Sequence, residues 1–197
     1  MLFVIASNNQ KKVEELSRIL RPLGIQAKTP SELGITLDDV EETGTTFQEN
    51  AEIKAEAASR KTGLPAIADD SGLVVDALDG RPGVYSARYA ENDQAKIEKL
   101  LKELNECSAT DRTAHFVCCI CCCFPDGEKI FVNGQCDGTI GFAPRGSNGF
   151  GYDPIFFVEG NKTFAELSDK QKDAMSHRGK ALKQLSIALT NKFENKN

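Results

Sequence analysis

The sequence predicts an α/β fold, in which helices cover a β-sheet, and three observations support this class. A wholly apolar run at residues 2–6 is typical of a strand buried on both faces, and a helical pattern follows it. A second apolar run ends at Ala68, directly after an alanine-rich helical stretch. Later, two strand-like segments joined at residues 125–128 indicate a β-hairpin, which would add an antiparallel part to the sheet.

Length and composition limit the classes of protein and partner. With 197 residues, 40% hydrophobic and 27% charged, the chain fits one domain or two closely joined lobes. A formal net charge of −5 argues against a nucleic-acid partner, which normally requires a basic surface. No run reaches membrane-spanning length and residues 1–6 are too short for a signal peptide, so we expect a cytoplasmic protein without a membrane partner.

A polar turn separates the first strand from the first helix. Apolar residues recur at helical spacing at Val13, Leu16, Ile19 and Leu20, and Gly24 is placed to end the helix. Helix N-termini favour phosphate, although an ordinary capped helix start explains the turn equally well, and the glycines of a P-loop are missing. The residues of this turn are Ser7, Asn8, Asn9, Gln10, Lys11 and Lys12.

An acidic irregular stretch and a second helix follow. Residues 30–45 include the adjacent acids Glu41 and Glu42. Thr46 and Glu49 have the spacing of a capping box, and the helix that they open should run to Gly63. Lys54 lies within it and can reach back toward the sheet, although a lone helical lysine is more often directed to solvent.

The stretch Ala68-Asp69-Asp70-Ser71-Gly72-Leu73 is the strongest local signal. We expect the strand to end in a turn at residues 69–72 and a further strand to extend through Leu78. Buried carboxylates are costly unless a cation, a metal or strong donors offset their desolvation. Asp69 and Asp70 would point in opposite directions if the strand continued through them. The pair therefore marks a candidate site.

The middle of the chain should form a tight turn at 79–83, a short helical turn or loop at 84–89, and a helix at 94–104. The hairpin strands are predicted at 113–124 and 129–137. Five of the seven cysteines fall within residues 118–123. Alternate strand residues face opposite sides, so this run predicts a buried core strand rather than a zinc or redox site.

Two further segments carry candidate binding residues. Residues 138–151 hold five glycines and lead into Phe150-Gly151-Tyr152-Asp153, which is either a flexible connection or a stacking platform for a planar group. The last quarter should be helical, beginning with a capping box at residues 168–171. Adjacent helical residues point about 100° apart, so Ser176 and His177 do not form a hydrolase pair. We interpret Lys172, Ser176, His177 and Arg178 as donors to an oxygen-rich ligand.

Together these motifs resemble, over nearly the whole chain, the non-canonical purine nucleoside triphosphate pyrophosphatases, also called inosine/xanthosine triphosphate pyrophosphatases. The resemblance implies an elongated mixed sheet with two lobes and a substrate cleft between them, the second lobe built largely from residues 80–150. It also implies a homodimer that uses Mg2+ to hydrolyse ITP, dITP or XTP to the monophosphate and pyrophosphate. The motifs are residues 7–12, Glu41-Glu42-Thr43-Gly44, residues 68–73, Phe150-Gly151-Tyr152-Asp153 and Ser176-His177-Arg178.

The resemblance also assigns roles to residues. Glu41 and Asp70 would hold the metal, and Asp70 would also be the catalytic base. Our own hypothesis from the residues is that Asp70 binds the metal directly, with Asp69 as the water-activating partner or as a support of Asp70. The phosphates would contact Ser7, Asn8, Asn9, Gln10, Lys11, Lys12, Lys54 and Ser71. The base and sugar would contact Phe150, Gly151, Tyr152, Asp153, Lys172, Ser176, His177 and Arg178.

Elementary chemistry supports this set, and two alternatives remain. Mg2+ suits carboxylates rather than thiols, and lysines stabilise charge that builds on phosphoryl oxygens. Hypoxanthine and xanthine present an acceptor oxygen at position 6 where adenine presents a donor, so a pocket of donors favours the first two. The alternatives are a non-catalytic nucleotide sensor and a nucleotide pyrophosphatase that acts on modified pyrimidines.

Overall fold

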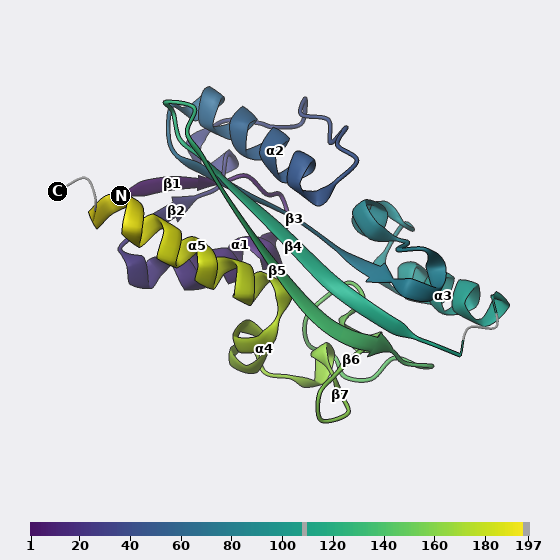
Figure 1. Cartoon of the computed structure of the whole chain (residues 1–197). Helices are drawn as coiled ribbons and strands as arrows, with labels where there is room; N and C mark the ends of the chain where they lie inside the picture. Colours follow the sequence, from purple (N-terminus) through teal and green to yellow (C-terminus); the bar gives the residue numbers. More distant parts are fainter. Residues whose placement is uncertain (108–109, 195–197) are drawn as a thin grey trace. The chain divides into compact units, whose positions relative to one another are not determined.

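The computed structural model describes residues 1–107 and 110–194, apart from the side chain of Ile19, so the predicted role of Ile19 on the apolar helix face lies outside the described part. The helices are α1 (Gln10–Leu20), α2 (Phe47–Thr62), α3 (Asp93–Glu106), α4 (Asp169–Met175) and α5 (His177–Glu194). The strands are β1 (Leu2–Ile5), β2 (Gln26–Lys28), β3 (Ala66–Val75), β4 (Thr113–Cys123), β5 (Lys129–Ile140), β6 (Phe156–Val158) and β7 (Lys162–Thr163). Figure 1 shows these elements along the chain.

The strands form one mixed sheet in the order β2-β1-β3-β4-β5-β6-β7. β1 pairs in parallel with β2 and β3, whereas β6 pairs antiparallel with both β5 and β7. The predicted α/β class with a mixed sheet is therefore confirmed. In the register of β1 on β3, Ile5 lies opposite Ile67, so the polar turn after β1 begins close to the acids that follow Ala68.

The chain divides into two compact units, which are described separately. The first comprises Met1–Asp70, Cys118–Gly134 and Lys180–Asn197. In this unit α2 covers one face of the strands, while α1 and α5 cover the other (Figure 1). The second comprises Ser71–Val117 and Gln135–Gly179, and its core packs α3 against Phe116, Phe156 and Phe164.

The cysteine-rich strand β4 is a core strand, as predicted. Cys118 and Cys122 pack in the cluster that includes α1 and α5, whereas Cys119, Cys121 and Cys123 pack against the alanines of α2. Burial raises the pKa of Cys119 to about 11 and that of Cys121 to about 12, so both thiols stay protonated at neutral pH. Small side chains on strand and helix allow α2 to approach the sheet closely.

The predicted turn at residues 69–72 was wrong, because β3 continues without interruption from Ala66 to Val75. Glycine and two acids usually end a strand. Here the acids remain in the strand because each contacts a lysine, Asp69 with Lys12 and Asp70 with Lys54, and these cations offset the cost of burial.

Other boundaries also differ from the predictions. β5 extends to Ile140, so the glycine-rich loop starts later than predicted, and Gly138 belongs to the strand. A Cβ atom on Gly138 would lie 2.3 Å from the carbonyl oxygen of Phe157, so glycine here allows the strands to pack closely.

Ser176 lies between α4 and α5, and not within one helix as we assumed. The short strands β2, β6 and β7 were not predicted. None of the helices in the described residues is long and apolar enough to cross a membrane.

An acid–histidine cluster joins three segments of the second unit. His115 on β4 places Nδ1 2.8 Å from Asp137 on β5 and Nε2 3.3 Å from Asp76, which lies in the 3-10 turn η3 (Asp76–Leu78). Gln135 donates to Asp137 beside them. Burial alone would lower the pKa of His115, but its hydrogen bonds to Asp137 and Asp76 raise it above the ordinary value.

Replacing His115 with glutamine should therefore destabilise the protein in a pH-dependent way. A raised histidine pKa contributes stability that is complete below the ordinary value of 6.5 and is lost as the pH rises through the folded-state pKa. We expect H115Q to lower the free energy of unfolding by about 0.5 to 1 kcal/mol near pH 5.5 and by almost nothing near pH 9. Urea unfolding at both pH values measures this, and a pH-independent difference would contradict it.

Candidate functional site

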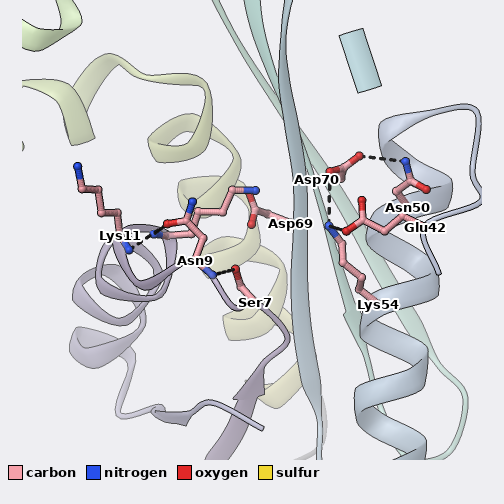
Figure 2. A network of polar contacts seen from close by, with 9 residues as sticks. Ser7, Asn9, Lys11, Glu42, Asn50, Lys54, Asp69 and Asp70 are labelled. Carbon is pink, nitrogen blue, oxygen red and sulfur yellow. Dashed lines mark hydrogen bonds and ion pairs between the residues drawn. The ribbon is translucent and has the colours of Figure 1, made fainter. Parts of the chain in front are cut away.

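The polar turn after β1 is a capped helix start. Asn9 is the N-cap of α1, and its side-chain oxygen accepts from the backbone N–H groups of Lys11 at 3.1 Å and Lys12 at 3.3 Å. The hydroxyl of Ser7 accepts from the Asn9 N–H at 3.2 Å, which closes the turn (Figure 2). Asn8, Asn9, Gln10 and Lys11 are exposed. The turn thus presents polar side chains to solvent at the positive end of the α1 dipole.

The two adjacent acids of β3 lie on opposite faces of the strand. Figure 2 shows Asp69 directed toward the β1–α1 turn and Asp70 directed toward α2. Both are buried, with 1% and 7% of their surface exposed. The alternation follows from strand geometry, in which neighbouring side chains point to opposite faces. Each acid therefore meets a different helix and a different lysine.

Lys12, in the first turn of α1, pairs with Asp69. Its Nζ lies 3.0 Å from Asp69 Oδ2, and the Asp69 side chain is completely buried. A buried carboxylate is stable only with a partner of this kind. The pair holds the lysine of the polar turn at the carboxyl end of β1.

Lys54 joins Asp70 to the acidic stretch before α2. Its Nζ lies 3.4 Å from Asp70 Oδ1 and 3.2 Å from Glu42 Oε1. Burial alone would lower the pKa of Lys54, but the charges of Asp70, Asp69 and Glu42 raise it above the ordinary value. Burial raises the pKa of Asp70, although the Lys54 and Lys12 charges act in the opposite direction.

Asn50 fixes the acidic stretch against Asp70. It is completely buried, accepts from the Gly44 N–H at 2.9 Å and donates to Asp70 Oδ2 at 3.3 Å. A Cβ atom on Gly44 would lie 2.7 Å from the Asn50 oxygen, so only glycine fits at position 44. The loop that carries Glu41 and Glu42 is thereby held close to β3.

The acids around Lys54 suit a hard divalent cation. In the described residues no group of three or more His, Cys, Asp or Glu side chains could hold a metal by itself. However, Asp70 and Glu42 already converge on one positive charge, the Lys54 ammonium. Mg2+ commonly binds one or two carboxylates and completes its coordination with water and substrate phosphates. Glu41, the residue selected from the sequence, is exposed, and its neighbour Glu42 is the one that contacts Lys54.

The second unit contains a loop, Phe150 to Asp153, that is fixed by Asp153. The Asp153 carboxylate is buried, and its Oδ2 accepts from the Phe150 N–H at 2.8 Å and from Lys172 Nζ at 2.9 Å. Gly149 has a φ of +74°, and a Cβ atom there would lie 2.0 Å from this oxygen. The loop is thus tightly built rather than a flexible connection.

Cationic groups gather near the ring of Phe150. Lys172 Nζ lies 4.9 Å and Arg178 Cζ 5.8 Å from the ring centre. Both residues are buried, and Phe150 is half-buried. His177 is also buried, and its ring stacks on Phe116 with centroids 4.7 Å apart.

Tyr152 and Ser176 are occupied within the second unit. Tyr152 is buried in the core, and its hydroxyl donates to the carbonyl oxygen of Ser86 at 3.0 Å. Of the two aromatic rings in this loop, Phe150 is therefore the one that is partly exposed. The Ser176 hydroxyl accepts from the Gly179 N–H at 3.1 Å and so caps the start of α5.

Comparison with known proteins identifies the family. The model of the Ham1 family matches residues 3–188. The chain belongs to this family. It is 50% identical over 190 residues to a Bacillus licheniformis protein named dITP/XTP pyrophosphatase, covering 94% of this chain and 96% of that protein. The family expected from the motifs is thus confirmed.

Solved structures of the Ham1 family have the same fold. The HAM1 protein from Coxiella burnetii matches with a TM-score of 0.89 and 45% identity, covering 97% of this chain and 99% of that one. The Staphylococcus aureus Ham1 protein matches with a TM-score of 0.87 and 47% identity, covering 98% and 100%.

The predicted site residues of this Ham1 chain fall into two groups, one in each unit. Asp69, Asp70, Lys12 and Lys54 come together in the first unit, with the polar turn beside them. Phe150, Asp153, Lys172 and Arg178 come together in the second. Ser71 follows Asp70 on β3 and is half-buried. The contacts of Glu42 and Asn50 were not predicted, although the position of Asn50 in α2, four residues after the N-cap Thr46, was a usable signal.

Replacing Lys12 with methionine should destabilise the protein, because it removes the cation beside the completely buried Asp69 carboxylate. We expect K12M to lower the free energy of unfolding by about 2 to 3 kcal/mol and the K12M/D69N double variant to recover much of that loss. Urea unfolding of wild type, both single variants and the double variant forms a double-mutant cycle. Additive losses would show that the two side chains are not coupled.

Proposed function

We propose that this chain is a nucleoside triphosphate pyrophosphatase that hydrolyses ITP, dITP and XTP to the monophosphate and pyrophosphate. The observation that carries the proposal is the meeting of two buried acids of β3 with two lysines from different helices, beside a helix N-terminus. Asp69 serves to hold Lys12, whereas Asp70 can also accept a proton from water, a role that simple binding of a polyanion does not need. A relative that is 50% identical is named dITP/XTP pyrophosphatase, which supports this substrate class.

The phosphates are proposed to bind at the polar turn of the first unit. Ser7, Asn8, Asn9 and Gln10 offer hydrogen-bonding groups at the positive end of α1, and Lys11, Lys12 and Lys54 supply charge, with Ser71 as a further donor. Hydrolysis between the α and β phosphates increases the charge on the phosphoryl oxygens. Lysines fixed by Asp69 and Asp70 stabilise that charge without having to move.

Asp70 is the proposed catalytic base. Its carboxylate accepts a proton from the water whose oxygen attacks the α-phosphorus, and pyrophosphate leaves. The raised pKa of Asp70 makes the ionised carboxylate a better base than an exposed aspartate. Asp69 faces the other side of β3, where its role is to hold Lys12 in place.

Asp70 and the Glu41-Glu42 pair are the proposed oxygen ligands of Mg2+. When bound, Mg2+ would neutralise phosphate charge and polarise the phosphorus–oxygen bonds. Asn50 holds the glutamate-bearing loop beside Asp70 and directs its amide at one carboxylate oxygen of Asp70.

The base is proposed to stack on Phe150 in the second unit, with Lys172, His177 and Arg178 as donors. A 6-oxo group accepts from such donors, whereas the amino group of adenine leaves them unpaired at a cost on the order of 1 to 3 kcal/mol each. Asp153 and Gly151 shape this loop, and Ser176 sets the start of α5, which carries His177 and Arg178. Tyr152 supports the loop from the core.

We also propose a cellular location and an oligomeric state for the enzyme. Removal of damaged purines from the nucleotide pool implies a cytoplasmic location. The homodimer implied by the family resemblance remains part of the proposal, and gel filtration with light scattering tests it. A sensor would bind the same nucleotides without turnover, and an enzyme for modified pyrimidines would prefer the smaller bases.

Pyrophosphate release from a nucleotide panel, with and without Mg2+, tests the function. We expect release from ITP, dITP and XTP with Mg2+ and little without it, because the oxygen ligands and the phosphates need a shared cation. The rate on ATP should be at least about 100-fold lower. D70N should lose about 1000-fold or more in kcat, because it removes both the proposed base and a metal ligand. Release from no nucleotide would favour the sensor, and preference for modified pyrimidine nucleotides would favour the other enzyme class.

Base selection is tested by replacing Arg178 or Lys172. R178Q and K172M each remove a cation near the Phe150 ring, so kcat/KM for ITP should fall by about 10-fold to 100-fold, and the preference for ITP over ATP should shrink. K170M is the matched control, since Lys170 is exposed on the same helix as Lys172. An unchanged ratio of ITP to ATP rates in both variants would rule out these donors.

A further inference from the structure

A hydrogen bond between distant segments fixes the Phe150–Asp153 loop at its second residue. The N–H of Gly151 donates to Asp93 Oδ2 at 2.8 Å, across 58 positions of sequence. Gly151 has a φ of +62°, a conformation that favours glycine. Asp93 is the first residue of α3 and has no place in the motifs that identify the family.

The other residues of this loop are held by different partners. Asp153 accepts from the Phe150 N–H, the Tyr152 hydroxyl donates to Ser86, and Lys172 pairs with Asp153. Asp153 holds Phe150 from within the loop. Asp93 acts from α3, outside the loop, and binds the residue directly after the aromatic ring.

Asp93 is not required as the cap of its helix. Asn92 is the N-cap of α3, and its side chain accepts from the Ala95 N–H at 2.9 Å. Asp93 Oδ1 accepts from Lys96 Nζ at 3.1 Å, which orients the carboxylate and leaves Oδ2 directed at Gly151. Asn92 therefore caps α3, and Asp93 is left to accept from the Gly151 N–H.

The charge of Asp93 strengthens this contact. A carboxylate accepting from a backbone N–H forms a charge-assisted hydrogen bond, which is shorter and stronger than a neutral one. The carboxylate also lies at the N-terminus of α3, where the helix dipole stabilises negative charge. The Gly151 amide is therefore held by an acceptor that is itself fixed by α3 and Lys96.

The geometry points to Asp93 as a positioning residue for base recognition: through the Gly151 N–H it sets the orientation of Phe150 relative to Lys172 and Arg178. This inference rests on the proposed function, because it takes the Phe150 ring as the surface on which the purine stacks. Asp93 touches neither base nor phosphate. Its loss should weaken binding of the purine part and leave binding of the phosphates and the chemical step unchanged.

The test compares D93A and D93N with two controls in the full chain. N92A removes the cap of α3 but keeps the Asp93–Gly151 contact, and K96A removes the ion pair between Lys96 and Asp93. The measurements are kcat and KM for ITP, the dissociation constant of IMP by calorimetry, the inhibition constant of pyrophosphate, and the melting temperature.

We expect D93A to raise KM for ITP and Kd for IMP by about 10-fold, with kcat and pyrophosphate inhibition within about twofold of wild type. D93N should recover part of the IMP affinity, since the amide oxygen still accepts from Gly151 but without the negative charge. N92A should lower the melting temperature while leaving KM unchanged, and K96A should change KM by less than about threefold.

Wild-type IMP affinity in D93A would overturn the inference, and so would an equal rise of KM in N92A, because that would show a general effect of α3 stability. Failure of the proposed function gives a different result. A wild-type chain that binds IMP but does not hydrolyse ITP would overturn the enzyme proposal, while the IMP arm would still decide the role of Asp93. A wild-type chain that neither hydrolyses ITP nor binds IMP would overturn both.

Discussion

The first unit depends on the need to pair two adjacent buried carboxylates in the middle of a strand. β3 alternates, so Asp69 and Asp70 face different layers, and each forms an ion pair with a different lysine. Lys12 from α1 pairs with Asp69, and Lys54 from α2 pairs with Asp70. Each lysine is thereby held in one place, and the strand continues through a sequence that usually forms a turn. The same contacts would provide electrostatic preorganisation in the proposed function.

The sequence was sufficient for the fold class, the long helices and the β4–β5 hairpin, because these have strong periodicity or capping signals. The capping boxes at Thr46 and Ser168 began helices at the predicted positions. The short strands β6 and β7 were not predictable, since two or three residues carry no period. The uninterrupted course of β3 depends on lysines that are distant in sequence, which local turn propensity ignores.

The candidate site was predictable as a set of residues but only partly as a set of contacts. The family resemblance selected Asp69, Asp70, Lys12 and Lys54, and the structure brings them together. The sequence did not show which of Glu41 and Glu42 contacts Lys54, because the course of the loop decides which of the two side chains reaches it. The contact of Asp93 with Gly151 had no sequence signal, since it joins a helix start to a loop 58 positions later. Tyr152 was expected to contact the base, but it is buried and its hydroxyl donates to Ser86, so it supports the loop from the core.

The distribution of thiols has a practical consequence for biophysical work on this protein. Of the seven cysteines, Cys107 is exposed and the other six are buried. A maleimide dye or spin label added to the native protein therefore has one accessible attachment point, without any need for a cysteine-free background. Cys107 is the C-cap of α3, the helix whose first residue holds Gly151. A probe attached there would report on the surroundings of the C-terminal end of this helix.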